Sequence, residues 1–448
     1  MTKSVGHTRN MTTGDPIRLI LTFAIPMLIG NIFQQFYNMV DTMVVGRCLG
    51  DTAIAAIGAT ASLYSLIINF ANGLNNGYGI IVTQRFGAQD RQQLKQAIAG
   101  MMTLNLSLAL VLTGVSLALL KHLMVFLNTP ADIFQMAYQY IFAIICGITA
   151  TLGYNMFSAI LRAMGNSRTP LYFLILASLL NIGLDLLFVA VFRWGVAGAA
   201  GATVIAQAVS ALLSGWYVFR NYRPFLPEKA DFRVPASMLK TLFSSGIAMG
   251  LMGCVVDAGN VILGRTNNLL GEVYIAAYAA QRKLLVIMIQ PQATLAAANS
   301  TFIGQNWGAK KFDRIHKTML KVWGMELLWG ITASTVIFLF GGPLVQFLTG
   351  TQDQSVLQNA VLSLRIHFTT FPFLGLIFST RNALQAMGHK IAPITSSAIE
   401  LVLKIFAASI LIPKLGFLGT CLTEPIIWCC MSTFLVGYYF IRAKKTLR

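Results

Sequence analysis

Long apolar segments, each sufficient to cross a lipid bilayer, follow one another along almost the whole chain. A membrane-spanning helix requires about 20 predominantly apolar residues, and about twelve such segments can be identified. They lie near residues 17–46, 52–82, 94–120, 132–162, 170–192, 195–219, 236–264, 272–303, 317–341, 356–386, 393–413 and 416–441. The composition agrees, because 56% of the 448 residues are hydrophobic and only 11% are charged, whereas soluble domains have about 25% charged residues. The sequence therefore predicts an all-α membrane protein with twelve transmembrane helices.

The net charge of +18 is distributed unevenly between alternate loops. If the N-terminus is cytoplasmic, the loops on that side hold most of the basic residues, among them Arg85, Arg91, Arg168, Arg223, Lys310, Arg381, Lys390 and Arg442. The opposite loops keep only Arg47, Lys121, Arg193, Arg265 and Lys414. This asymmetry follows the positive-inside rule. The basic excess therefore orients the protein in the membrane, with both termini cytoplasmic, and does not indicate nucleic-acid binding.

The two sides of a Pro-containing polar stretch at residues 221–230 repeat one another. Four motifs recur with nearly constant separation, pairing Leu49–Ala56 with Leu270–Ala277, Gln84–Ala88 with Gln305–Ala309, Leu161–Gly165 with Leu384–Gly388, and Gly195–Gly198 with Gly416–Gly419. Each half holds about six spans, an even number, so both halves enter the membrane from the same side. The predicted domains are a six-helix bundle over residues 1–220, a cytoplasmic linker over 221–235 and a second six-helix bundle over 236–448. We expect a pseudo-two-fold axis along the membrane normal to relate them.

A polar stripe interrupts the first apolar segment, just after a helix start that Asp15 and Pro16 are suited to cap. Gln34, Tyr37, Asn38 and Asp41 have the i, i+3, i+4, i+7 spacing of one helix face. A carboxylate at mid-membrane depth costs about 3 kcal/mol or more, so it must face protein or a hydrated cavity. The stripe therefore predicts a polar pathway. Pro26, in the same segment, permits a kink that is either static or a moving hinge.

A second acid lies on the fifth span, where Asn181 and Asp185 are i, i+4 neighbours. Further polar faces run along the sixth span from Thr203 and along the second span from Asn69. Two carboxylates in one low-dielectric cavity cannot both be ionised cheaply, so at least one should hold a proton near neutral pH. Alternatively, oxygens from Asn181 and Thr203 could complete a Na⁺ site. A structural ion pair is disfavoured because the first half has no intramembrane Lys or Arg.

The second half does not copy this chemistry. Its charged residues are Asp257, Arg282, Lys283, Glu326, Arg365, Glu400, Lys404 and Glu424. Glu400 and Lys404 are spaced i, i+4 and are expected to form a structural pair. Asp257 and Glu424 have no obvious partner nearby in sequence, which makes them further candidates for ion or substrate contact.

The sequence resembles the multidrug and toxic compound extrusion (MATE) family, and its DinF-like branch above all. The resemblance covers about Gly14 to Tyr439 and combines the twelve-span repeat with several motifs. These are Asp15-Pro16, Pro26, the two Gln-x-x-Gly-Ala loops, Leu161–Pro170, Asn181–Asp185 and Gly195–Ala200.

The resemblance implies a monomeric bacterial inner-membrane transporter that exports cationic or amphiphilic drug-like compounds by alternating access, coupled to H⁺ or Na⁺ entry. The branch's ion site is similar to Asp41, Asn181, Asp185 and Thr203 here, and its cavity lining is similar to Tyr37 and Asn155. A NorM-like branch instead places its cation site in the second half, near Asp257. Some accounts of the family make the first helix bend at the proline equivalent to Pro26.

The residues also bear on other functions. No Walker sequence (G-x-x-x-x-G-K) and no nucleophile–base pattern is present, so a nucleotide-driven pump and an enzyme are both disfavoured, and no cofactor is expected. A lipid-linked precursor flippase of the same superfamily remains the alternative, because Arg282, Lys283 and Arg365 could contribute to a cationic cavity. A receptor without transport activity is disfavoured by the paired acids and the two-bundle repeat.

Overall fold

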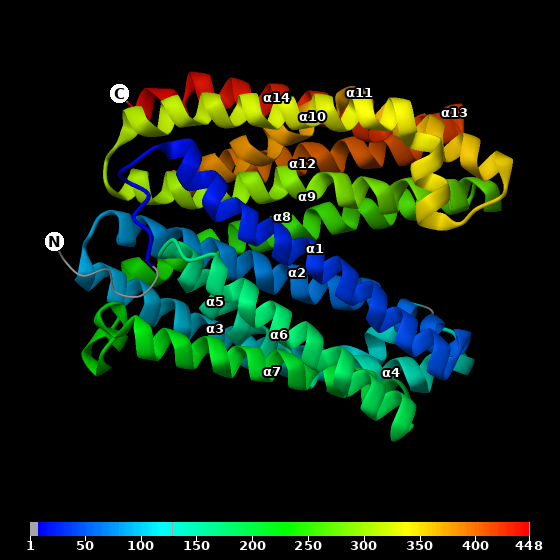
Figure 1. Cartoon of the computed structure of the whole chain (residues 1–448), viewed down its shortest axis with the longest axis horizontal. Helices are drawn as coiled ribbons and strands as arrows, with labels where there is room; N and C mark the ends of the chain where they lie inside the picture. The colour runs from blue at the N-terminus through cyan, green and yellow to red at the C-terminus, as the bar shows by residue number, and fades with distance from the viewer. Residues whose placement is uncertain (1–7, 128, 448) are drawn as a thin grey trace. The chain divides into compact units, whose positions relative to one another are not determined.

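The computed structural model describes residues 8–127 and 129–447, and within these ranges the chain forms helices and turns but no strand. The first half contains α1 (Pro16–Leu49), α2 (Asp51–Gly87), α3 (Arg91–Phe126), α4 (Ala131–Cys146), α5 (Ile148–Ala163), α6 (Arg168–Asp185) and α7 (Gly195–Asn221). The second half contains α8 (Ala236–Asn268), α9 (Glu272–Gly308), α10 (Phe312–Thr349), α11 (Gln354–Ala386), α12 (Ile391–Phe406), α13 (Ile412–Leu415) and α14 (Phe417–Ile441). Figure 1 labels these helices along the chain.

These elements make six membrane passes in each half. Helices α4 and α5 form one pass with a bend of 44°, and α12 and α13 form another. Judged by length and apolarity alone, eight helices of the described chain can span a membrane, or ten when bent pairs are counted as single spans. Helix α9 is outside this set because polar and charged residues interrupt it, and α12 because it has only 16 residues. The predicted all-α, twelve-helix fold is confirmed by the structural relatives described below.

The repeated sequence motifs are turns with a shared backbone requirement. Each contains, or is directly followed by, a residue with positive φ, a conformation that most L-residues avoid and glycine adopts freely. The equivalent glycines of the two halves are Gly50 and Gly271, Gly165 and Gly388, and Gly195 and Gly416, and Gln89 and Lys310 directly follow the Gln84–Ala88 and Gln305–Ala309 motifs. The motifs therefore recur because the two halves need the same chain reversals at the same places.

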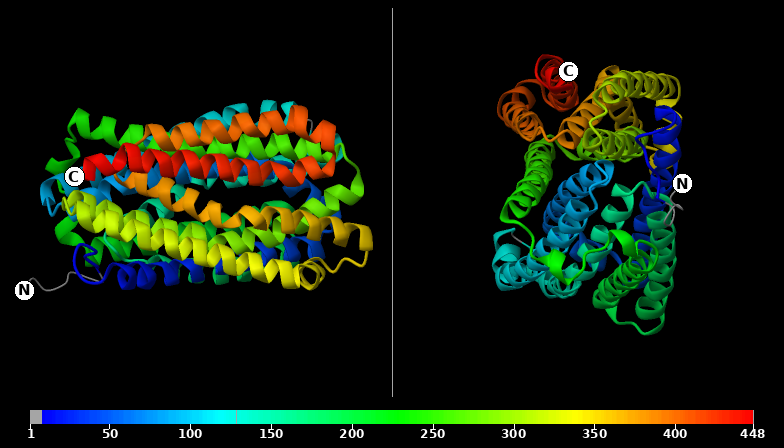
Figure 2. Two further views of the ribbon diagram at one scale, coloured as in Figure 1. Left: turned by 90° about the horizontal axis from the view of Figure 1, so that it is seen from above. Right: turned by 90° about the vertical axis from the view of Figure 1, so that its left-hand side faces the viewer.

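The chain divides into two compact units that do not follow the middle of the sequence. The first contains residues 8–10 and 25–250, and the second contains residues 11–24 and 251–447. Because of these bounds, the start of α1 is part of the second unit and the start of α8 is part of the first. The right-hand view of Figure 2 shows the helices end on. Each break falls inside a long helix, after Ala24 in α1 and after Gly250 in α8.

Hydrogen bonds from the turn before α1 fix the start of this helix to the second unit. The Met11 N–H donates to Gln305 Oε1 at 2.8 Å, and Asn306 Nδ2 donates to the Met11 carbonyl at 3.1 Å. Arg314 adds a donor at 2.7 Å from the Gly14 carbonyl. The Asp15 side chain accepts from the Arg18 N–H at 2.8 Å, which confirms the predicted cap before Pro16.

Small residues hold the start of α8 against α2 in the first unit. Gly73 and Gly77 of α2 face Gly250 and Gly246 of α8. A Cβ on Gly73 would lie 2.6 Å from the Gly250 Cα, and one on Gly77 would lie 2.6 Å from the Gly246 Cα. Such close backbone approach is typical of small-xxx-small packing between membrane helices.

Replacing Gly77 with leucine is therefore expected to destabilise the first unit by about 1–3 kcal/mol or more, because the new side chain overlaps the α8 backbone. The measurement is the thermal unfolding midpoint of the detergent-purified protein. Gly58→Leu is the matched control, because Gly58 lies on the same helix with no atom within 4 Å of an added Cβ. Equal midpoints for the two variants would contradict this packing.

Each half also contains a π-helical segment at an equivalent position. Residues Leu186–Val191 follow Asp185, and residues Ala407–Leu411 follow α12. Such segments are rare and are often found at functional sites. Here the second half has the segment without an acid before it, so the π-helical segment belongs to the repeat and not to the carboxylate alone.

Candidate functional site

Two aspartic acids from different helices meet inside the first unit. Asp41 lies on α1 and Asp185 is the last residue of α6, and their carboxyl groups are within hydrogen-bonding reach of each other. Asp185 is fully buried, and the Oδ1 atom of each residue has no hydrogen-bond partner. Because a carboxylate has no proton to donate, a hydrogen bond between two carboxyl groups requires at least one shared proton.

Asn181 links this carboxyl pair to α7. It is one helical turn before Asp185 and is almost fully buried. In the amide orientation that satisfies both ends, Nδ2 donates to Asp185 Oδ2 at 2.8 Å and Oδ1 accepts from the Thr203 N–H at 3.0 Å. The opposite orientation brings Nδ2 within 3.3 Å of Thr203 Oγ1. Asn181 therefore contacts Thr203 in both orientations.

Tyr37 closes the cluster from α1. Its hydroxyl is hydrogen-bonded to the Thr203 side chain, and it lies within electrostatic range of both Asp41 and Asp185. Thr203 Oγ1 also lies 3.2 Å from the Ala199 carbonyl, to which it donates. The structure thus brings Tyr37, Asp41, Asn181, Asp185 and Thr203 into one cluster, named the carboxyl site below.

Two tyrosines that the sequence analysis did not single out border the carboxyl site. Tyr64 on α2 and Tyr140 on α4 both lie within electrostatic range of Asp41. The available signal was a tyrosine in an otherwise apolar span, since a buried phenol usually needs a polar neighbour. The signal is weak because most membrane tyrosines mark the lipid–water interface.

The remaining predicted residues of the first half have other surroundings. Gln34 and Asn38 are exposed on α1, and Asn69 is exposed on α2, where it donates to Ser65 Oγ at 2.9 Å. Asn155 on α5 donates to Asn72 Oδ1 on α2 at 2.6 Å. These positions stay predictions for substrate contact.

Pro26 lies inside α1, next to the break between the two compact units. Helix α1 continues through it from Pro16 to Leu49. Because proline removes one helical hydrogen bond, this is the position where α1 resists bending least. The hinge at Pro26 stays a prediction.

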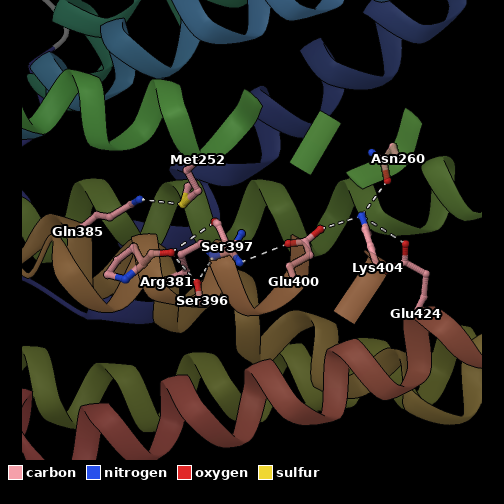
Figure 3. A network of polar contacts seen from close by, with 10 residues as sticks. Met252, Asn260, Arg381, Gln385, Ser396, Ser397, Glu400, Lys404 and Glu424 are labelled. Carbon is pink, nitrogen blue, oxygen red and sulfur yellow. Dashed lines mark hydrogen bonds and ion pairs between the residues drawn. The ribbon is translucent and has the colours of Figure 1, made fainter. Parts of the chain in front are cut away.

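A chain of buried charges runs through the second unit (Figure 3). Lys404 Nζ is 2.9 Å from Glu400 Oε1, which confirms the predicted i, i+4 pair. The same ammonium group donates to Asn260 Oδ1 at 2.8 Å. Lys404 is only 1% exposed, so its charge depends on these partners.

The structure supplies a partner for Glu424 and corrects one prediction for this half. Glu424 has no partner nearby in sequence, but its Oε1 lies 3.7 Å from Lys404 Nζ, because α12 and α14 pack side by side. Arg381 was placed in a cytoplasmic loop, but it is buried on α11. There its Nη2 lies 3.7 Å from Glu400 and its Nε donates to Ser396 at 3.1 Å. Asp257 is half-buried on α8 and lies near Cys254.

The described residues contain no group of three or more His, Cys, Asp and Glu side chains suited to a metal ion. The carboxyl site nevertheless offers oxygens from Asp41, Asp185, Asn181 and Thr203, and two carboxyl oxygens there have no partner. Hard monovalent and divalent cations prefer such oxygen ligands. The chemistry of the site therefore suits a proton or a small hard cation.

The chain is similar in sequence to known membrane transporters. The MatE family profile matches the chain twice, over residues 26–187 and 248–410. This double match confirms the repeat inferred from the four motifs. The chain is 27% identical over 381 residues to the probable multidrug resistance protein YpnP of Bacillus subtilis, covering 85% of this chain and 84% of the relative. It is 23% identical over 410 residues to the probable multidrug resistance protein NorM of Thermotoga maritima, covering 89% and 87%.

Solved structures show the same fold. A MATE protein in a bent conformation superposes with a TM-score of 0.90 at 23% identity, covering 97% of this chain and 98% of that one. A multidrug resistance MATE family transporter in an outward-facing conformation gives 0.90 at 22% identity, covering 99% and 100%. With the family profile matching most of both halves, the chain belongs to the MatE family of multidrug and toxic compound extrusion transporters, which are not enzymes.

Proposed function

We propose that this protein exports cationic or amphiphilic drug-like compounds across the bacterial inner membrane, driven by the entry of a coupling ion through the carboxyl site. The relatives named above as multidrug resistance proteins support the substrate class. The observation that carries the proposal is the contact between Asp41 and Asp185 within a membrane-spanning unit. A contact of this kind serves no evident packing purpose, since polar groups of equal size without charge would pack at lower cost.

The site's chemistry favours a proton as the coupling ion. A single proton shared by Asp41 and Asp185 removes the repulsion between two buried carboxylates. When this proton is lost, the carboxyl site has a net negative charge. A cationic substrate is attracted to this charge once the site becomes accessible from one side of the membrane. Proton and substrate would then occupy the site in alternation, and each would exclude the other by charge. Asn181 holds Asp185 in place by a hydrogen bond and is itself held by Thr203, and neither residue needs to move a proton.

Sodium is the alternative coupling ion at the same residues. It would bind to the deprotonated carboxyl groups together with oxygens of Asn181 and Thr203. In either case the ion-coupling residues come from the N-terminal half, and one copy of the chain supplies all of them. The DinF-like assignment, the monomeric state and the cytoplasmic location of both termini stay predictions that agree with this proposal.

A lipid-linked precursor flippase is a weaker proposal. It would need unpaired basic side chains to hold a pyrophosphate. In the second unit Lys404 and Arg381 are neutralised by Glu400 and Glu424, and Arg365 donates to the Phe338 carbonyl. The charges of Lys404 and Arg381 are thus balanced, which suits a structural role better than an anion site.

The proposal is tested by transport of a fluorescent cationic dye in proteoliposomes under a proton gradient and, separately, under a sodium gradient. We expect the proton gradient to drive dye movement against its concentration and the sodium gradient to have no effect. Transport with sodium alone would replace the proton by Na⁺ at the same residues. Transport under neither gradient, with protein shown to be folded, would contradict ion-coupled export.

A further inference from the structure

A second buried carboxyl group, far along the sequence from the carboxyl site, lies inside the second unit. Glu326 on α10 has no exposed surface, and neither of its oxygens has a hydrogen-bond partner. None of the ion pairs among the described residues includes it. Ionised carboxylates are almost never left in this state, because burial removes water and nothing replaces it.

An amide with a complementary deficiency lies beside this carboxyl group. Gln292 on α9 is also fully buried, and its Oε1 has no partner, while its Nε2 makes a long contact of 3.4 Å with the Phe371 carbonyl. A Cβ placed on Gly375 of α11 would lie 2.8 Å from both Glu326 Oε2 and Gln292 Nε2. Glu326 and Gln292 therefore face the same small space, which Gly375 leaves open.

One proton resolves the deficiency. A neutral Glu326 has an O–H that can donate to Gln292 Oε1, and its carbonyl oxygen can accept from the amide. An ionised Glu326 could accept from the Gln292 amide N–H, but it would leave Gln292 Oε1 without a donor. The basic side chains of α9, α10 and α11 do not neutralise the charge that an ionised Glu326 would have. Arg381 is paired with Glu400, Arg365 donates to a carbonyl, and His367 has its Nδ1 2.8 Å from the Ser363 carbonyl. Arg282, Lys283 and Lys321 form no ion pair with Glu326.

Two of the helices around Glu326 contain a proline close to it. Pro291 precedes Gln292 in α9, and Pro372 lies three residues before Gly375 in α11. Each proline removes a helical hydrogen bond. The carbonyl of Phe368, which Pro372 leaves without a helical donor, accepts from Ser334 of α10 at 2.6 Å. Gly330 of α10 meets the Pro372 backbone so closely that an added Cβ would lie 2.5 Å from the Pro372 Cα. Helices α10 and α11 are therefore in tight contact beside Glu326, while α9 and α11 each lack a backbone hydrogen bond there.

We propose that Glu326 is a proton-binding site of the second unit, which holds its proton against Gln292 while α9, α10 and α11 are packed and releases it when water enters between them. The ligand is a single proton, because the space has one missing donor and too few oxygens to surround a metal ion. Release during transport rests on the proposed function, whereas proton binding at rest does not.

The test is infrared spectroscopy of the purified full-length protein at neutral pH. A protonated carboxylic acid has a C=O stretching band that an ionised carboxylate lacks. We expect Glu326→Gln to reduce this band by the amount of one acid. Glu228→Gln is the matched control, because the Glu228 side chain is 79% exposed and lies 2.6 Å from Lys95 Nζ, so its loss should leave the band unchanged. An unchanged band in Glu326→Gln would overturn the proposal.

Two further measurements cover folding and release. If Glu326→Gln does not fold, Gln292→Met removes the partner alone, and we expect the C=O band to move to higher frequency as its hydrogen bond is lost.

Substrate-induced proton release in weakly buffered detergent solution should fall by one proton per protein in Glu326→Gln. An unchanged count together with a lost band would mean a fixed structural acid and would overturn the release step. Failure of dye transport in all variants and in the wild type would contradict the proposed function and leave the infrared result standing.

Discussion

Replacing Asp41 or Asp185 with asparagine is expected to reduce gradient-driven dye efflux by about 5- to 150-fold, the range that corresponds to coupling free energies of about 1–3 kcal/mol. Asparagine keeps the size and polarity of the side chain but cannot gain or lose a proton. The shared proton would therefore no longer respond to the gradient. Substrate binding without a gradient should be weakened as well, because the negative charge that attracts a cation is reduced.

The measurement is the initial rate of dye transport in proteoliposomes with matched protein content. Asp132→Asn is the control, because Asp132 is exposed in the first turn of α4 and the same chemical change there should not affect transport. Asn181→Leu should give an intermediate loss, since it removes a hydrogen bond that positions Asp185 but leaves both carboxyl groups. If the Asp41 and Asp185 variants retain wild-type efflux, the coupling ion does not use this site.

Replacing Lys404 with alanine is expected to give the largest loss of stability, about 3–5 kcal/mol, because it breaks a buried ion pair and leaves its partners charged. Lys404 is 1% exposed and is the cation between Glu400 and Glu424. After its removal Glu424 has no ion-pair partner in the described structure, and Glu400 keeps only the longer contact with Arg381.

Lys95→Ala is the matched control for this loss of stability, because it breaks a shorter ion pair that is exposed to water. Lys95 Nζ is 2.6 Å from Glu228 Oε1, but the Glu228 side chain is 79% exposed. Pairs of that kind are worth about 0–1 kcal/mol. Thermal unfolding midpoints of the purified variants test the difference. Adding Glu424→Gln to Lys404→Ala should recover part of the loss, and equal destabilisation by the two lysine variants would contradict the argument from burial.

Much of the carboxyl site was predictable from spacing, because a helix has a fixed period. Tyr37 and Asp41 are four residues apart, as are Asn181 and Asp185, so each pair shares a helix face whatever the rest of the chain does. The high cost of a carboxylate in a membrane then requires both acids to face protein or water. Neither argument could show that the two acids contact each other, because α1 and α6 are separated by more than a hundred residues.

Predictions for the second half were limited in the same way. The pairing of Glu400 with Lys404 was predicted correctly because it is local to one helix. The partner of Glu424 was missed because Lys404 lies on another helix, and Arg381 was assigned to a loop because a charged residue at the end of an apolar run usually belongs there. Helix packing brought Arg381 to Glu400 instead. Glu326 was visible as an intramembrane acid, but its missing partners became apparent only from its burial.

The sequence by itself determined that this chain is a membrane protein of two repeated helical halves with two acids in the first. Hydropathy, helix period and positive-φ turns depend only on neighbouring residues, so they can be read from the order of residues. The tertiary structure alone decided which side chains from distant helices meet. It placed Asp41 against Asp185, Lys404 between two glutamates and Glu326 beside Gln292, because such contacts depend on how whole helix faces fit together.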